Sequence, residues 1–373
     1  LKMDNIKSSR FNKTTFIILI SIVFSILIFN FLFSQKDKKI KEFIIDKETQ
    51  IVKEKINEKE IICDVNFVIS NCLNEDLDNN ILLLGNSQLN GINQKKKNDH
   101  LTSYYLINRL QKIDTNLITF ALPNGSITEF LILYEYLNSK IKVDKLVIPL
   151  VFDDLREGTI RSDLSSLFDD FDFKNKFNKN QHRKKILKKI VKQNDVVKNY
   201  ESEESIQDSV ERKISNFLNT CCNYESKKKY AANRIYHNLY LLRNYIFNID
   251  PSSERKMIPS FYQDNVESLK EIIKSSKKNN INLYFYIAPI RQDLKLPYKI
   301  DEYNEFLIFS EKISETYKVN FRNYEKIIPN NLWGTKPGTS IDRNKEVDFM
   351  HFQGPAHKIL SSHIYNFLNS NDF

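Results

Sequence analysis

The sequence predicts an α/β fold, a three-layer α/β/α sandwich around a parallel sheet, with a helical insertion and an N-terminal transmembrane helix. From about residue 79, short apolar runs alternate with segments of helical spacing, which is typical of parallel strands connected by helices. The alternation stops at about residues 160–262 and then resumes, which predicts the insertion. Residues 14–33 carry no charge and form an apolar stretch of about 20 residues, long enough to span a bilayer.

The expected strands are short runs rich in apolar residues, and they are Ile81–Gly85, Leu117–Leu122, Lys145–Phe152, Asn282–Ala288 and Val319–Tyr324. Wholly apolar runs indicate strands that are buried on both faces. The expected helices place apolar residues at helical spacing, and they are His100–Lys112, Ile127–Ser139, Val266–Lys277, Asp301–Tyr317 and Ala356–Leu368. Ser126 followed by Glu129 is typical of a helix N-cap, so the second helix is expected to begin there.

Four segments are expected along the chain: a cytoplasmic tail at 1–13, a transmembrane anchor at 14–33, a helical stalk at 34–62 and a large domain at 63–373. The apolar stretch is too long for a signal peptide and lacks a small-residue cleavage site, which favours an uncleaved signal anchor. Lysines flank both ends of the apolar stretch, so the positive-inside rule favours a cytoplasmic N-terminus only weakly. With that orientation, the chain is a single-pass membrane protein whose large domain is extracytoplasmic.

The composition narrows the choice of partners and cofactors. Lys and Arg number 56 against 47 Asp and Glu, a net charge of +9, but the excess is spread along the chain without zinc-finger or helix-turn-helix spacing. Nucleic acid is therefore not an expected partner. Cys63 and Cys72 could close a short disulfide loop, and buried free thiols are equally compatible with the four cysteines. No metal-ligand cluster or nucleotide motif is evident, so no cofactor is expected.

The insertion at about 160–262 is expected to be helical and to lie over the carboxyl edge of the sheet. It contains a basic run, Lys174–Lys192, followed by an acidic patch, Glu201–Glu204. A lid, a partner-docking surface and a membrane-surface contact are alternatives for the basic run. The preferred interpretation is a solvated cationic helix.

The strand Ile81–Gly85 leads directly into Asn86 and Ser87. A glycine at the strand end allows a tight turn, and open α/β sheets place their sites at the carboxyl ends of strands. A serine on a sharp strand-to-helix turn exposes its hydroxyl as a nucleophile. The alternative is an ordinary polar turn after a strand.

Serine becomes an effective nucleophile when a base accepts its proton, and a carboxylate commonly orients that base. Asp348 and His351 are three residues apart, in an expected loop just before the last helix. This loop follows the last expected strand, so it should lie at the same sheet edge as Ser87. Asp348 and His351 are therefore the candidate partners of Ser87.

Acyl transfer also needs hydrogen-bond donors for the oxyanion. The backbone N–H of Ser87 is the first candidate, and Gly125, after the second strand, is the next because it has no side chain. A third donor is expected after the third strand, where Asp153 and Asp154 stand.

The combination of these motifs resembles the SGNH (GDSL-type) hydrolases and acyltransferases. Ser87 in Gly85-Asn86-Ser87, then Gly125, the polar pair after the third strand and Asp348-x-x-His351 occur in the order typical of that family, over about residues 79–156 and 264–370. The resemblance implies a flavodoxin-like α/β/α fold and a serine nucleophile that deacylates or transacylates esters. The large domain is accordingly interpreted as SGNH-like.

Two positions depart from the family pattern. Asn86 stands where the family usually has aspartate, a swap that also occurs in members acting on the cell envelope. Asp153 stands where an asparagine side chain usually donates to the oxyanion, and an ionised carboxylate cannot donate. Either Asp153 is turned away, or it is held protonated, or Asn124 supplies the amide instead. Pairing of Arg156 with either aspartate would favour a structural role for the pair.

The leading hypothesis is a membrane-anchored SGNH-type serine esterase or O-acyltransferase acting on a cell-envelope glycan or polymer. In it, Ser87 attacks the ester, His351 is general base and then acid, Asp348 orients His351, and a sugar hydroxyl or water takes the acyl group. The arrangement of an anchor, a stalk and an extracytoplasmic domain resembles single-span acyltransferases of the alginate-acetylating and teichoic-acid D-alanylating kind. This resemblance implies a multi-span membrane acyltransferase as partner. The alternative is a catalytically inactive SGNH scaffold that binds an envelope glycan or a membrane partner. The enzyme hypothesis predicts that activity rises with pH as His351 becomes neutral.

Overall fold

Five parallel strands form the centre of the sheet in the computed structural model, which describes residues 51–54, 60–62, 79–113, 115–158, 160–201, 254–336 and 345–370. In chain order they are β3 (Asn80–Gly85), β4 (Asn116–Ala121), β5 (Lys145–Leu150), β6 (Asn282–Ile287) and β7 (Asn320–Asn323). Across the sheet they are ordered β4-β3-β5-β6-β7, and each neighbouring pair is parallel. This is the second-first-third-fourth-fifth order of flavodoxin-like sheets. The predicted α/β fold with a parallel sheet is confirmed.

Two further strands extend the sheet beyond β4. β1 (Ile51–Glu54) pairs antiparallel with β4 and with β2 (Glu60–Ile62). The helical stalk predicted over 34–62 therefore needs correction at its C-terminal end. Ile51 and Val52 are β-branched, and the open edge of β4 offers them hydrogen-bond partners that outweigh the helix preference of the neighbouring Lys and Glu residues.

The predicted anchor at 14–33 and the remainder of the stalk lie outside the described residues. Within the described ranges, no helix combines the length and the apolar character that crossing a membrane requires. All described residues belong to one compact unit, Thr49–Glu204 with Asn238–Phe373.

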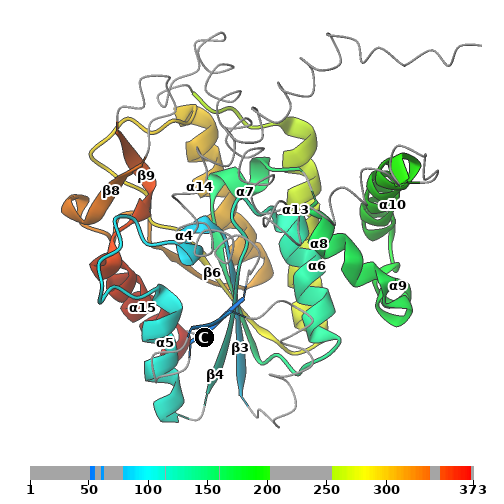
Figure 1. Cartoon of the computed structure of the whole chain (residues 1–373), viewed down its shortest axis with the longest axis horizontal. Helices are drawn as coiled ribbons and strands as arrows, with labels where there is room; N and C mark the ends of the chain where they lie inside the picture. The colour runs from blue at the N-terminus through cyan, green and yellow to red at the C-terminus, as the bar shows by residue number, and fades with distance from the viewer. Residues whose placement is uncertain are drawn as a thin grey trace, which may run out of the picture. The chain divides into compact units, whose positions relative to one another are not determined.

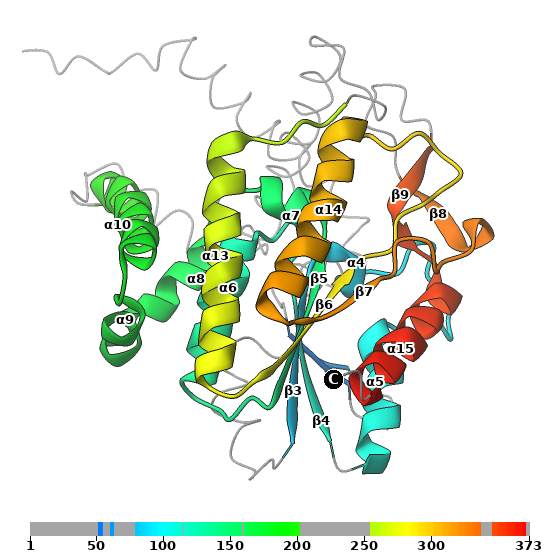
Figure 2. The ribbon, with the colours of Figure 1, turned by 180° about the vertical axis from the view of Figure 1, so that it is seen from behind.

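Helices cover both faces of the sheet (Figures 1 and 2). α5 (Thr102–Leu110) and α15 (Gly354–Asn369) pack against each other on one face. α6 (Ile127–Asn138), α13 (Pro259–Lys278) and α14 (Ile300–Tyr317) lie on the other, where α13 packs on α6 and Tyr262 of α13 meets Phe309 of α14. Because two helix layers sandwich the sheet, every residue of β3 is buried.

Local sequence signals place most helix ends. Ser126 and Glu129 form the predicted capping box at the start of α6. α13 begins at Pro259, seven residues earlier than predicted, and proline suits the first turn because its missing N–H has no helical partner there. Short helical segments complete the connections: η3 (Gln111–Ile113), α7 (Phe152–Arg156) and η5 (Asn330–Leu332).

The first part of the insertion is helical, as predicted, and consists of α8 (Ser162–Ser165), η4 (Ser166–Asp169), α9 (Phe171–Phe177) and α10 (Gln181–Glu201). α9 and α10 lie beside α6 and α13, on the outer side of that helix layer, and not over the carboxyl edge of the sheet (Figure 2). The position is explained by Arg183 of α10, a buried cation that pairs with Glu135 of α6 at 2.7 Å and with Glu271 of α13 at 3.1 Å. Residues 202–253 and all four cysteines lie outside the described residues.

Candidate active site

Ser87 is positioned by a sharp turn between β3 and α4 (Ser87–Asn90). Asn86 caps α4, since its side chain accepts a hydrogen bond from Gln88 N at 3.0 Å. A Cβ atom at Gly85 would come within 2.4 Å of Leu89 Cδ1, so glycine leaves room for the Leu89 side chain against this turn. The Gln88 side chain donates to the backbone oxygens of Pro289 and Met350, both at 2.8 Å, and so ties α4 to the neighbouring segments.

Asp348 and His351 lie on a strand and not in the predicted loop. β9 (Glu346–Phe352) pairs antiparallel with β8 (Trp333–Lys336) in a separate two-stranded sheet. The register moves from Thr335–Val347 to Trp333–Phe352, so two steps along β8 match five along β9. The extra length forms a bulge in which Asp348 Oδ1 accepts the N–H groups of Met350 and His351 at 2.9 and 3.0 Å. Bulges commonly re-aim side chains next to active sites.

The structure brings the three predicted residues into one hydrogen-bonded chain. His351 Nε2 lies 2.9 Å from Ser87 Oγ, and His351 Nδ1 lies 3.0 Å from Asp348 Oδ2. Burial acts to raise the pKa of Asp348, but its hydrogen bond to His351, the charge of His351 and the backbone N–H groups outweigh burial, so the pKa is lowered. Asp348 is therefore a carboxylate at neutral pH and can accept the Nδ1–H of His351.

Asn93 is a member of this cluster that sequence reasoning missed. Its Nδ2 donates to Asp348 Oδ2 at 3.1 Å, and its backbone N–H donates to Phe352 O at 3.0 Å. A Cβ on Gly334 of β8 would collide with the Asn93 side chain, so glycine there makes room for it. An asparagine in a polar loop carries no local signal for this role.

Asn86 and Asp154 form a second buried contact beneath the serine. Asn86 Nδ2 lies 3.1 Å from Asp154 Oδ2 and 3.3 Å from Oδ1. Burial raises the pKa of Asp154 well above its usual value, the hydrogen bond from Asn86 acts in the opposite direction, and the charge of Asp153 adds to the increase. An aspartate at position 86 would set two carboxyl groups against each other, so the amide of Asn86 suits this buried partner.

Replacing Asp154 with asparagine is expected to stabilise the protein increasingly as pH rises. The unfolded chain loses the Asp154 proton near the ordinary value of 3.8, whereas the folded protein keeps it to higher pH. The contribution of Asp154 to stability is thus fully present below pH 3.8 and is lost as pH rises through its folded-state pKa. Asparagine does not titrate, so the free energy of unfolding of Asp154→Asn should gain on wild type by up to about 1.4 kcal/mol per pH unit.

Urea unfolding at about pH 5 and about pH 8 measures this difference. The exposed Asp301→Asn variant is the matched control for the change from carboxyl to amide. A constant difference between Asp154→Asn and wild type across this range would contradict the prediction.

Gly125 does not take the predicted place in an oxyanion hole. Its N–H donates to Leu122 O at 2.8 Å within a turn, and Gly125 is not among the residues that line the cavity at Ser87. Its neighbour Asn124 does line that cavity and has a positive φ of 54°. Among non-glycine residues, asparagine tolerates this left-handed conformation best.

Asp153 also lines the cavity, but it is held as a hydrogen-bond acceptor. Its Oδ2 accepts from Arg255 Nη1 at 2.7 Å and from the Tyr298 hydroxyl at 3.0 Å. Arg156 lies 3.8 Å from Oδ1, which is the ion pair considered from the sequence. With Arg255 and Tyr298 as its donors, Asp153 is held as an acceptor and does not serve as a hydrogen-bond donor in the cavity.

The cavity at Ser87 has a volume of about 140 Å³ and a mixed polar lining. Besides the residues above, it is lined by the charged side chains of Glu157 and Lys336 and by Val151, Phe349 and Met350. Among the described residues, no group of three or more His, Cys, Asp or Glu side chains is arranged to hold a metal ion.

No known family model matches the chain, and no curated protein matches it. Solved structures similar to this chain include a GDSL-like lipase from Bacteroides thetaiotaomicron, with 10% identity over 77% of this chain and 86% of the lipase and a TM-score of 0.34. An acylhydrolase from Bacteroides fragilis has 9% identity over 83% of this chain and 98% of its own, with a TM-score of 0.38. The acetylxylan esterase Axe2 from Geobacillus stearothermophilus has 9% identity over 79% of this chain and 95% of its own, with a TM-score of 0.36.

Proposed function

We propose that the chain is a serine esterase or O-acyltransferase of the SGNH type, with Ser87 as nucleophile, His351 as general base and acid, and Asp348 as the group that orients His351. The observation that supports this most strongly is the hydrogen-bonded chain of Ser87, His351 and Asp348, with contacts of 2.9 and 3.0 Å. Nucleophile, base and orienting carboxylate in hydrogen-bond reach are the arrangement that activates a serine hydroxyl.

The contacts define a proton path. Asp348 accepts the Nδ1–H of His351, which leaves the lone pair of Nε2 free to accept the proton of Ser87 Oγ. Ser87 Oγ then bonds to the carbonyl carbon of the ester. The bond between that carbon and the alcohol oxygen of the ester breaks, and His351 gives the proton to this leaving oxygen. The resulting acyl-Ser87 is released by the reverse sequence, in which His351 accepts a proton from water or from a sugar hydroxyl that attacks the acyl carbon.

In this mechanism the oxyanion is stabilised by the Ser87 N–H and by the side-chain amide of Asn124. Ser87 begins α4, where backbone N–H groups lack helical partners. Asn124 lines the same cavity as Ser87 and replaces the donor that Asp153 does not supply. Donors of this kind typically contribute about 3 kcal/mol of transition-state stabilisation each.

The proposed substrate is an ester of a small acyl group on a cell-envelope glycan or polymer. A cavity of about 140 Å³ suits a short acyl group, since pockets for drug-sized ligands run from about 300 Å³ upward. The apolar, uncharged stretch at 14–33 supports a single membrane anchor with the enzyme domain outside the cytoplasm. A multi-span membrane acyltransferase that delivers the acyl group is the proposed partner, in keeping with the resemblance in the sequence.

A catalytically inactive scaffold that binds an envelope glycan or a membrane acyltransferase is the second candidate. One observation favours it: Asp153, at the position of an expected donor, is engaged by Arg255 and Tyr298 as an acceptor. Such a scaffold would keep the Ser87 contacts without turnover.

Covalent labelling by a fluorophosphonate probe separates the two candidates. Folded wild-type protein should be labelled at Ser87, and Ser87→Ala and His351→Ala should lose the label. Ser260→Ala, which removes an exposed serine at the start of α13, is the matched control and should label like wild type. Absence of labelling in folded wild type would favour the scaffold.

Asn93 is proposed as a positioning residue that acts through Asp348. Asn93→Ala should lower kcat/KM by about tenfold, because a hydrogen bond to a charged group contributes about 1.5–3 kcal/mol and part of it maintains the Asp348–His351 geometry. The pH–rate profile should shift as well, since Asp348 then faces His351 with one donor fewer. Ester hydrolysis across pH measures both effects, with Asn98→Ala, an exposed change in the same loop, as control. A loss equal to that of Asn98→Ala, with an unchanged profile, would rule the role out.

A further inference from the structure

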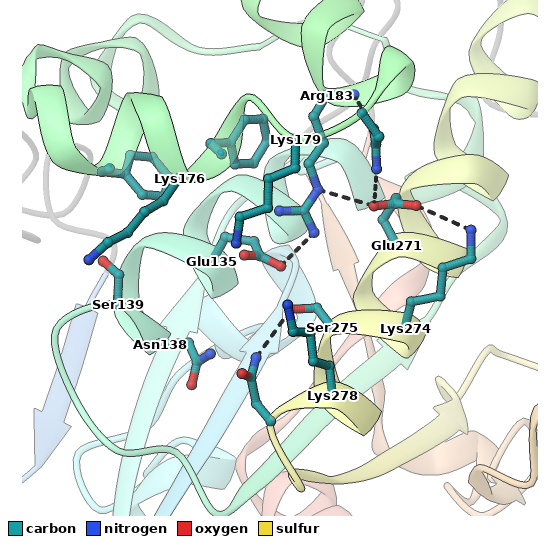
Figure 3. Close-up of a pocket in the computed structure, with 14 residues that line it drawn as sticks. Glu135, Asn138, Ser139, Lys176, Lys179, Arg183, Glu271, Lys274, Ser275 and Lys278 are labelled. Atoms are coloured by element: carbon teal, nitrogen blue, oxygen red, sulfur yellow. Dashed lines mark hydrogen bonds and ion pairs between the residues drawn. The ribbon is translucent and has the colours of Figure 1, made fainter.

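A second and larger hollow lies between the insertion and the outer helices, away from the residues that line the Ser87 cavity (Figure 3). Its volume is about 430 Å³, within the range of about 300–1,000 Å³ that is typical of ligand pockets. Its walls come from the C-terminal ends of α6 and α13, from α9, and from the start of α10. We call it the lysine cleft.

The lysine cleft carries more positive than negative side chains. Five cations line it, Lys176, Lys179, Arg183, Lys274 and Lys278, against two carboxylates, Glu135 and Glu271. Both carboxylates are already used, because Arg183 binds the two of them and Lys274 lies 3.3 Å from Glu271. Within the described ranges, Lys176, Lys179 and Lys278 form no ion pair.

Arg183 holds together the three helices at the bottom of the lysine cleft. Its side chain is 6% exposed and its guanidinium bridges α10 to α6 and α13. Asn180 adds a further contact to α13, because its side-chain amide donates to Glu271 Oε2 at 2.6 Å. The hollow is therefore built by buried contacts between three segments, whereas Lys176, Lys179 and Lys278 at its rim are exposed and have no carboxylate partner among the described residues.

Helix dipoles offset only part of the positive charge of Lys176, Lys179 and Lys278. α6, α9 and α13 end at the lysine cleft, and each C-terminus carries about half a negative charge. Three such ends amount to about one and a half charges, less than the three ammonium groups of Lys176, Lys179 and Lys278.

The lysines reach the hollow from two sides, so one small anion would not contact all of them. Lys176 and Lys179 come from α9 and the segment after it, and Lys278 comes from the last turn of α13 (Figure 3). Asn138 and Ser139 add neutral hydrogen-bonding groups of the kind that hydroxyl-bearing ligands use. A chain with several separated negative charges and hydroxyl groups fits this arrangement.

We propose that the lysine cleft binds an anionic glycan polymer through Lys176, Lys179 and Lys278, which contact its phosphate or carboxylate groups. Nucleic acid is disfavoured because the aromatic side chains that line the cleft, Phe173 and Phe177, are buried and offer no face for base stacking. That this polymer is also the substrate rests on the proposed function of Ser87, whereas binding at the cleft does not require catalysis.

Binding to defined polymers tests the proposal with the full chain carrying Ser87→Ala, so that turnover does not interfere. Polyphosphate and polygalacturonate supply the two anionic chemistries, dextran is the neutral reference, and oligo(dT) represents nucleic acid. The cleft variant is Lys176→Gln/Lys179→Gln/Lys278→Gln. The matched control is Lys312→Gln/Lys326→Gln/Lys358→Gln, which removes the same charge from exposed positions outside the cleft.

The cleft variant should bind polyphosphate or polygalacturonate about tenfold more weakly at low salt. Its plot of log affinity against log salt should lose about two units of slope if each contact releases counterions as in nucleic-acid complexes. The control variant should bind like the parent. Binding of one anionic polymer alone, if lost in the cleft variant, would support an anion site at the cleft and identify phosphate or carboxylate as the recognised group. Polyphosphate tests the charge alone, because it carries no sugar, and polygalacturonate tests charge and sugar together.

Equal weakening in both triple variants would mean diffuse attraction by the net charge and would overturn the proposal. An unaffected cleft variant, equally tight binding of dextran, or tighter binding of oligo(dT) would overturn it too. Circular dichroism checks that both variants are folded. Fluorophosphonate labelling of the cleft variant with Ser87 restored shows separately whether Ser87 is a nucleophile, so failure of one proposal does not mimic failure of the other.

Discussion

Ser87→Ala is expected to lower kcat/KM for a small ester such as p-nitrophenyl acetate by about 10⁴-fold or more while leaving the fold intact. The substitution removes the Oγ atom that lies 2.9 Å from His351 Nε2, and the cavity keeps no other described serine among its lining residues. The remaining activity would come from binding and from the oxyanion donors alone. Steady-state hydrolysis, with circular dichroism as the check on folding, measures the effect.

Additivity provides the internal control for the Ser87 prediction. Residues that act as one unit lose activity together, so Ser87→Ala/His351→Ala should be little worse than Ser87→Ala. Ser260→Ala should hydrolyse the ester like wild type. Retention of most activity by Ser87→Ala would show that another group is the nucleophile.

Asp348→Asn should also lower kcat by about 10⁴-fold, through the tautomer of His351. Asp348 Oδ1 accepts the N–H groups of Met350 and His351, so the amide of the variant must keep its oxygen at that position. Its NH₂ group then takes the place of Oδ2, where it donates to His351 Nδ1 and no longer accepts the hydrogen bond from Asn93 Nδ2. His351 consequently carries its proton on Nε2, where it points at Ser87 and cannot accept the serine proton.

The split between kcat and KM measures the effect of the His351 tautomer. Folding and substrate binding should be little changed in Asp348→Asn, so the loss should appear in kcat and not in KM. Asp301→Asn, an exposed change of the same kind, should leave kcat unaltered. A small loss that is confined to KM would contradict an orienting role for Asp348.

The central sheet could be predicted because its signals are local. Ile81–Leu84 is wholly apolar and short, which suits a strand covered on both faces, and β3 is buried throughout. The capping box at Ser126 and Glu129 likewise acts within one helical turn. β1 was not predictable in this way, because its strand state depends on pairing with β4, and β4 lies more than 60 residues further along the chain.

The residues of the candidate site also fall into those with a local sequence signal and those without one. Ser87 could be proposed from a strand, a glycine and a serine in succession, and His351 from the short spacing to Asp348. Asn93, Arg255 and Tyr298 carry no such pattern, because their partners Asp348 and Asp153 are distant in sequence. For Gly125 the sequence predicted a role that the structure does not give it. Its position in the sequence suits an oxyanion donor, but its N–H donates to Leu122 O within a turn.

The sequence by itself determined the order of the five central strands and of the helices that cover them, the turn that exposes Ser87 and the short spacing of Asp348 and His351, since each depends on residues close together in the chain. Tertiary structure alone decided three things: the approach of His351 to Ser87, the role of Asp153 as an acceptor for Arg255, and the lysine cleft between α9, α10 and the outer helices. These features join segments that lie far apart in the chain. Burial and charge pairing at such contacts depend on which faces of the sheet and helices meet, and composition and local periodicity do not specify that.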